Sequence, residues 1–175
     1  MTTTTEAPVT RNVFDLIQPE DLMAVTATVQ RNNPGMAIDV AELITLEALK
    51  LEAACAAHPH ARLQPSRVVD EGWHAIILHT HVKQSLAARL GLFVHHVPEA
   101  PDTSRHDPGA LTRTRTRTRT RTRTQEAITA AGYTPEPAMW VGPSDNSITV
   151  AASCTHSPGG PEGSCTGECS NSGPN

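Results

Sequence analysis

The chain has 175 residues, of which 38% are hydrophobic and only 3% aromatic, so we expect one mainly aliphatic domain with flanking segments. Six of its 14 basic residues alternate with threonine between residues 113 and 123. The rest of the chain has eight basic and 18 acidic residues, a net charge of −10. This acidic remainder argues against a nucleic-acid-binding surface on the domain, because phosphate contacts need clustered Lys and Arg.

The first twelve residues, MTTTTEAPVTRN, have neither a basic region nor an apolar stretch, unlike a secretory signal. No apolar run approaches the roughly 18 residues needed to cross a bilayer. We therefore expect a cytoplasmic protein without a membrane segment, in which the cysteines stay reduced. Cys55 lies within a helical pattern, where a small buried thiol is expected.

Residues 1–12 are expected to be flexible, and a first helix follows from Pro19 until Asn32-Asn33-Pro34-Gly35 ends it. Asp39, with Glu42 three residues later, is the expected N-cap of a second helix, which Pro59 closes.

A third helix is expected from an N-cap at Ser66 to about Leu90, where Gly91 fits the left-handed position after a helix. Residues 13–101 form the predicted core domain. The sequence thus predicts an all-α fold, a small bundle of about three main helices.

Residues 102–124 comprise a loop and the Arg-Thr repeat, which buries no apolar area as a strand or as a helix, so we expect a solvated segment or a charged helical extension. Residues 125–142 are expected to be partly helical and to dock Tyr133 and Trp140 on the core. Residues 143–175, rich in Gly, Pro, Ser and Thr, are predicted to be a disordered tail.

Five of the nine histidines lie in DEGWHAIILHTHV and FVHHVP, between residues 70 and 98. At 100° per residue, Asp70, His74 and His81 share one stripe of the third helix, while His79 points away from it. Trp73 belongs to the apolar face beside this stripe and is the expected anchor.

After Gly91 the chain can return along the helix, and because extended residues alternate, one of His95 and His96 can face the stripe. Asp70, His74 and either or both of these histidines form a ligand set suited to zinc or another divalent ion, with His81 as a weaker candidate ligand. The same residues also fit hydrogen-bonded structural histidines, or metal-free acid–base catalysis in which Asp70 fixes the tautomer of His74.

The stretch PSRVVDEGWHAIILHTHVKQSLAARLGLFVHHVPEAP resembles bacterial counterparts of the glycine-rich domain-containing protein family, which carry V-D-x-x-W-H-x-x-I-L-x-T followed by G-x-F-x-H-H-x-P. The resemblance covers Val69 to Pro98. It supports Asp70, Trp73, His74 and the His95-His96 pair as site residues. His81 falls at a position that varies in such proteins, and Lys83 stands where a tyrosine is usual. The resemblance implies no established activity.

Two main functions therefore stay open at the level of sequence. One is a metal-binding protein with hydrolase-like chemistry, and the other is a non-enzymatic interaction module that uses polyanion binding by residues 112–124 and the cysteine-bearing tail. A third is a precursor or substrate of peptide modification. The tail set Cys154, His156, Cys165 and Cys169 matches no standard zinc-finger spacing.

Overall fold

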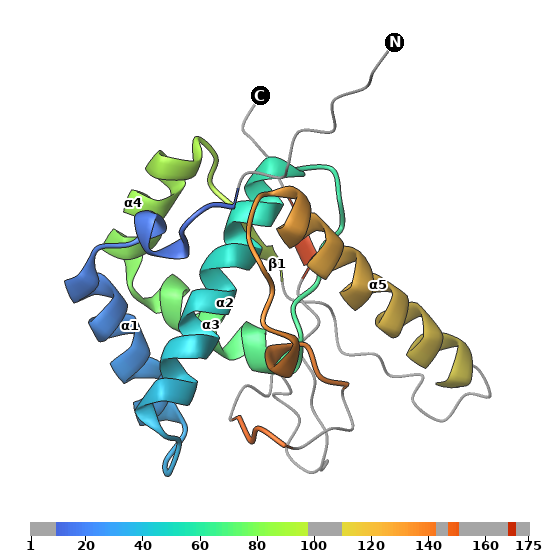
Figure 1. The fold of residues 1–175 in the computed structure, drawn as a ribbon, viewed down its shortest axis with the longest axis horizontal. Coiled ribbons are helices and arrows are strands. Elements are labelled where there is room, and N and C mark those ends of the chain that lie inside the picture. Colours follow the sequence, from blue (N-terminus) through green and yellow to red (C-terminus); the bar gives the residue numbers. More distant parts are fainter. Residues whose placement is uncertain (1–9, 98–109, 143–146, 151–167, 171–175) are drawn as a thin grey trace.

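The computed structural model describes residues 10–97, 110–142, 147–150 and 168–170. The predicted all-α fold is confirmed in these residues, which contain five α-helices and only two three-residue strands (Figure 1). The elements in chain order are the short 3-10 helix η1 (Val13–Leu16), α1 (Pro19–Asn32), α2 (Ile38–Ala57), α3 (Arg67–Leu78), α4 (Thr80–Leu90), β1 (His95–Val97), α5 (Ala110–Ala130), the 3-10 helix η2 (Pro137–Met139) and β2 (Glu168–Ser170).

Helix α2 is the centre of the bundle. It contacts η1, α1, α3, α5 and η2, and α1 and α5 lie on opposite sides of it in Figure 1. Its buried residues are distributed around the helix rather than along one stripe, as expected for a helix that is apolar nearly all round. They include two carboxylates, Glu47 and Glu52, whose side chains must therefore find partners inside the protein.

Gly72 allows α3 to lie close against α2. A Cβ atom at this position would lie 2.6 Å from the Ile44 carbonyl oxygen and 3.0 Å from the Ala48 Cβ. Only a residue without a side chain fits so close an approach. Gly72 thus fixes the depth at which the neighbouring Asp70 and Glu71 enter the core.

The third predicted helix is two helices. Ser66 caps α3 as expected, with its hydroxyl accepting from the Val69 amide, but α3 ends at Leu78 and α4 begins at Thr80. His79 lies between them with ψ of 75°, outside the helical range, and its Nε2 lies 2.8 Å from the Thr28 hydroxyl of α1. A contact 51 residues away in sequence thus accompanies the break, whereas the predicted end at Gly91, with φ of 72°, is confirmed.

The start of α2 also differs from the prediction. The helix begins at Ile38 with Ala37 as its N-cap, and the Asp39 carboxylate accepts only from the adjacent Val40 amide. Asp39 is therefore inside the first turn, where an acidic side chain interacts favourably with the helix dipole, rather than at the cap.

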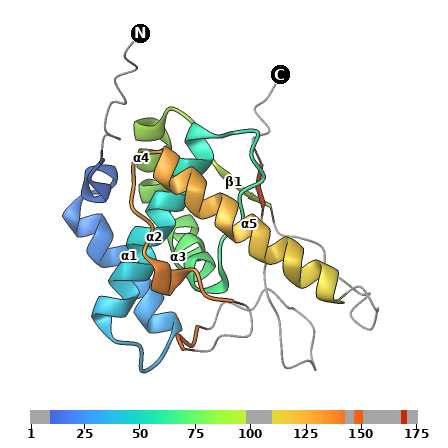
Figure 2. The ribbon, with the colours of Figure 1, turned by 45° about the vertical axis from the view of Figure 1, so that its right-hand side comes forward.

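The Arg-Thr repeat is helical and continuous with the segment after it, because α5 spans both. Its C-terminal part packs on the bundle through the buried residues Thr124 and Ile128, and the Thr124 hydroxyl accepts from the Gln64 amide at 3.1 Å. Its other end extends away from the bundle in Figure 2. Arg121 donates to the Val141 carbonyl oxygen at 2.7 Å, so one arginine of the repeat has a structural bond. The Tyr133 and Trp140 side chains are buried, as predicted.

Two short pieces of the predicted tail contact the core. Arg67 donates to the carbonyl oxygens of Ile148 and Val150, and β2 pairs antiparallel with β1 so that Cys169 is opposite His96. The rest of the predicted tail, including Cys154, His156 and Cys165, lies outside the described residues, as do residues 1–9 of the expected flexible start.

Cys55 is buried, as predicted, but the prediction of a thiol is wrong: its sulfur is disulfide-bonded. In the part of the chain that the structure describes, no helix combines the length and the apolar character needed to span a bilayer.

Candidate metal centre

Asp70 lies in the first turn of α3, where the Ser66 cap and the contact at Gly72 direct it inward. Its side chain is only 1% exposed. A buried carboxylate is costly unless its oxygens are hydrogen-bonded, paired with charge or bound to a metal. The groups around the Asp70 carboxylate therefore decide whether its role is structural or functional.

His74 is one helical turn after Asp70, so the two side chains lie on the same face of α3. Its Nδ1 is 3.8 Å from Asp70 Oδ2, too far for a hydrogen bond, and its side chain is 32% exposed. Helical spacing thus predicted this pair correctly, and His74 marks the side on which the cluster meets solvent.

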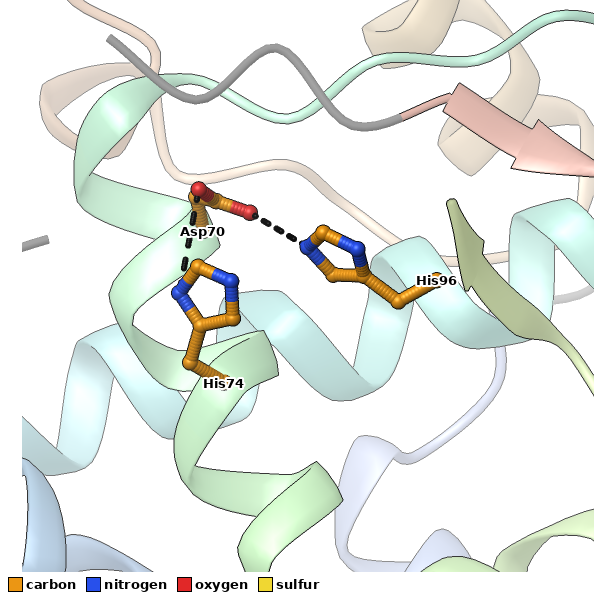
Figure 3. Close-up of side chains that lie close together, drawn as sticks. All are labelled: Asp70, His74 and His96. Atoms are coloured by element: carbon orange, nitrogen blue, oxygen red, sulfur yellow. Dashed lines mark ion pairs between the residues drawn. The ribbon is translucent and has the colours of Figure 1, made fainter. Parts of the chain in front are cut away.

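His96 approaches the same carboxylate from β1, a separate element (Figure 3). Its Nε2 is 3.4 Å from Asp70 Oδ1, and its side chain is 9% exposed. The imidazole packs against two rings of α3, with centroid distances of 4.6 Å to Trp73 and 4.7 Å to His74. Asp70 is therefore flanked by imidazoles from two different parts of the chain.

Three polar atoms at this place are buried and make no hydrogen bond within the described residues. They are both carboxylate oxygens of Asp70 and Nε2 of His96. Buried polar atoms in proteins are nearly always bonded to protein or to water, and each exception requires an explanation. Two of the three, Asp70 Oδ1 and His96 Nε2, face each other at 3.4 Å, so the cluster could accept a further group between its side chains.

The donor set fits a divalent metal ion. Asp70, His74 and His96 each offer one ligand atom, and these atoms lie within 4.8 Å of one another. A zinc ion at about 2.0–2.2 Å from each ligand would bring tetrahedral donors to roughly 3.4 Å apart. The separations around Asp70 are 3.4 Å from Oδ1 to His96 Nε2 and 3.8 Å from Oδ2 to His74 Nδ1, so each imidazole faces its own carboxylate oxygen.

Glu52 and Lys83 form a buried ion pair beside the cluster. The Lys83 ammonium donates to Glu52 Oε1, which also accepts the Trp73 indole N–H at 2.7 Å. Burial raises the pKa of the Glu52 carboxyl, and the Lys83 charge, the Lys83 and Trp73 hydrogen bonds and His96 partly oppose this shift. The Lys83 nitrogen also lies 5.2 Å from the centroid of the Phe93 ring.

The other predicted ligands lie elsewhere. His95 is exposed and its ring packs 4.8 Å from that of Phe93, so of the two histidines on β1 only His96 faces the cluster. His81 is exposed on α4 and lies outside the cluster, because the helix break at His79 invalidates its position on the predicted stripe. His79 points away as predicted, towards Thr28.

Glu52 and Lys83 were not predicted as a pair beside the site. Their pairing joins residues 31 apart in sequence, and no local pattern predicts it. The one available signal was Glu52 itself, a charge inside LKLEAACAA, where the surrounding residues are apolar enough to be buried.

No protein-family model matches this chain, and the comparisons with curated proteins and with solved structures also give no match. The resemblance to the glycine-rich domain-containing family therefore stays a prediction from the residues between Val69 and Pro98. The function must therefore be inferred from the site itself.

Proposed function

We propose that this protein binds one divalent transition-metal ion, with zinc the leading candidate, through Asp70, His74 and His96. The observation that carries the proposal is the group of three buried polar atoms without hydrogen bonds, two on Asp70 and one on His96. A bound cation would take His96 Nε2 and an oxygen of Asp70 as ligands and would compensate the buried charge of the carboxylate.

The types of donor favour zinc or a neighbouring first-row metal over magnesium or calcium. Two of the three ligands are imidazoles, whereas magnesium and calcium prefer sites built from oxygen ligands. Two histidines and a carboxylate form a set of borderline hardness that suits zinc, iron(II) and similar ions.

Three protein ligands leave a coordination position for water, which is typical of catalytic rather than structural zinc sites. A metal with an open position supplies Lewis-acid activation of that water molecule. His74 is the most exposed of the three ligands, so a substrate would approach from its side of the cluster. We therefore extend the proposal to hydrolase-like chemistry.

A purely structural role for these histidines is the main alternative. His79 shows what such a role looks like here, since its Nε2 meets the Thr28 hydroxyl at hydrogen-bonding distance. His96 Nε2 instead faces a carboxylate at 3.4 Å without forming a hydrogen bond. This contrast favours the metal site. Polyanion binding by residues 112–124 stays a prediction.

The test is metal analysis and calorimetric titration with zinc of the full chain, prepared without a histidine tag. We expect one tightly bound ion per chain. His74→Ala should weaken binding by more than the roughly 10- to 100-fold that loss of an outer hydrogen-bond partner costs. His95→Ala is the matched control, because it removes a neighbouring exposed histidine from β1, and it should bind as the wild type does.

Titration with cobalt(II) separates this site from the tail cysteines, because thiolate ligands add an intense charge-transfer band that imidazole and carboxylate ligands do not. The proposal predicts a cobalt spectrum without that band. A protein that takes up no ion and whose thermal stability is unchanged by zinc would contradict the proposal. A spectrum dominated by thiolate bands would contradict it as well.

A further inference from the structure

Helix α2 carries two buried carboxylates that are bonded in closely similar ways. Glu47 Oε1 accepts the Trp140 indole N–H at 2.6 Å, and Glu47 Oε2 accepts from the Lys50 ammonium at 2.7 Å. Glu52 Oε1 accepts the Trp73 indole N–H at 2.7 Å and also accepts from the Lys83 ammonium. Each set comprises one glutamate, one tryptophan and one lysine.

The two sets differ in what lies beyond the indole. The Trp73 ring packs against the His96 imidazole, with 4.6 Å between the ring centroids. The bonds of Trp140 lead instead towards Glu136, whose amide donates to the same oxygen of Glu47 at 3.2 Å. Only the Glu52 set therefore adjoins the cluster of Asp70, His74 and His96.

His96 needs support because its own strand gives it little. β1 has three residues, and within the described part of the chain no hydrogen bond holds the His96 side chain. Histidine ligands in metal sites are usually oriented by a hydrogen bond from the second ring nitrogen. Here the ring contacts of the imidazole are with Trp73 and His74, at centroid distances of 4.6 and 4.7 Å.

The indole of Trp73 is in turn fixed by its bond to Glu52. Trp73 is fully buried, and the bond from its N–H to a carboxylate selects one orientation of the ring. Lys83 compensates the charge of that carboxylate in the interior, and its ammonium lies 6.0 Å from the centroid of the Trp73 ring. A chain of contacts thus runs from Lys83 through Glu52 and Trp73 to His96.

We infer that Glu52 is a positioning residue of the metal site: by accepting the Trp73 N–H it holds the indole that orients the His96 imidazole towards Asp70. This inference rests on the proposed metal-binding function. Glu52 does not touch the ion, and its effect passes through Trp73. Lys83 keeps Glu52 in the interior and takes no further part.

The experiment compares two double variants that carry the same charge. Glu52→Gln with Lys83→Met removes both charges but keeps an oxygen that can accept the indole N–H. Glu52→Leu with Lys83→Met removes both charges and the acceptor. Replacing both members of a buried ion pair by uncharged groups of similar volume is often tolerated, so both proteins should fold. Cobalt(II) affinity and the ligand-field spectrum are measured on the full chain.

We expect the Gln-Met variant to bind cobalt within about threefold of the wild type, with the wild-type spectrum. The Leu-Met variant should bind roughly 10- to 100-fold more weakly, which is the usual cost of losing a partner that orients a ligand. Its spectrum should also change, because a tilted His96 alters the geometry around the ion. A merely structural role would lower stability without changing the spectrum.

Glu47→Leu is the matched control, because it removes the acceptor of the other tryptophan on the same helix. It should lower thermal stability but leave cobalt affinity and spectrum unchanged. If the Leu-Met variant does not fold, Trp73→Phe with the ion pair intact takes its place and should show the same weaker binding and altered spectrum.

The outcomes separate the two proposals. A wild-type protein that binds no metal overturns the proposed function. A wild-type protein that binds cobalt, together with a Leu-Met variant of unchanged affinity and spectrum, overturns the role of Glu52 alone. Equal losses in the Gln-Met and Leu-Met variants also overturn it, because the acceptor would then not be the cause.

Discussion

Two adjacent carboxylates of α3 face two different regions of the molecule. Glu71, 4% exposed, enters the corner between α1 and α2, where Asn33 Nδ2 donates to its Oε1 at 2.9 Å. Asn33 also donates to the Val29 carbonyl oxygen, so its hydrogen bonds join α1 to α3 at this corner. Asp70, 1% exposed, enters the region beside β1 and has no hydrogen bond within the described residues.

Both carboxylates are buried equally well, so burial alone does not distinguish a structural group from a functional one. The distinction comes from the partners. A buried carboxylate with its hydrogen bonds made contributes to the fold, whereas one left without them costs stability unless a ligand arrives. Departures of this kind from an otherwise consistent fold concentrate at functional sites.

The largest expected effect is on stabilisation by zinc. At a free zinc concentration of about 100 times Kd, binding to the native state adds roughly 2.7 kcal/mol, equivalent to about 5–10 °C in Tm for a chain of this size. Asp70→Asn should lose nearly all of this gain, whereas Glu71→Gln should keep it. Thermal unfolding with zinc and with a chelator measures the difference. Equal gains in the two variants would show that Asp70 is not a ligand.

A smaller effect of opposite sign is expected without metal. Asp70→Asn should leave the free energy of unfolding unchanged or raise it by up to about 1 kcal/mol, because a buried charge without hydrogen bonds is removed. Glu71→Met should lower it by about 1–3 kcal/mol, because Asn33 loses a buried acceptor. Urea unfolding in the presence of a chelator tests this. A loss for Asp70→Asn as large as that for Glu71→Met would contradict the contrast between the two carboxylates.

Much of the fold follows from local signals. A few neighbouring residues predict the cap at Ser66, the left-handed Gly91 and the limits of α1, and the structure agrees with each. The break at His79 has no such local signal, because no helix-breaking residue stands there and the contact that accompanies it is with Thr28 on another helix. A helical pattern read through the break then placed His81 on the wrong face.

The candidate site divides in the same way. Asp70 and His74 are one turn apart on one helix, so spacing alone brings them together. Alternation in β1 shows only that His95 and His96 face opposite sides, and the choice between them depends on how the strand returns to α3. Glu52 and Lys83 meet through tertiary packing, which sequence periodicity does not describe.

The smallest expected effect is the pH dependence of stability that Glu52 causes. Glu52 is a third buried carboxylate, and it accepts hydrogen bonds from Trp73 and Lys83. Burial raises its pKa in the folded state above the ordinary value of 4.5. The folded protein therefore keeps this proton at pH values where the unfolded chain has lost it. The resulting stabilisation is complete below the ordinary pKa and is lost as the pH rises through the raised folded pKa.

The wild type should accordingly lose stability, relative to the variant with Glu52→Gln and Lys83→Met, as the pH rises above about 4.5. Urea unfolding of both proteins with a chelator, from about pH 4 to about pH 8, measures the difference, in which most other titrating groups cancel. A difference that grows in favour of the wild type with rising pH would mean that the Lys83 charge outweighs burial. Glu52 would then resemble Glu71, which has its hydrogen bond, more than Asp70, whose oxygens have no hydrogen bond within the described residues.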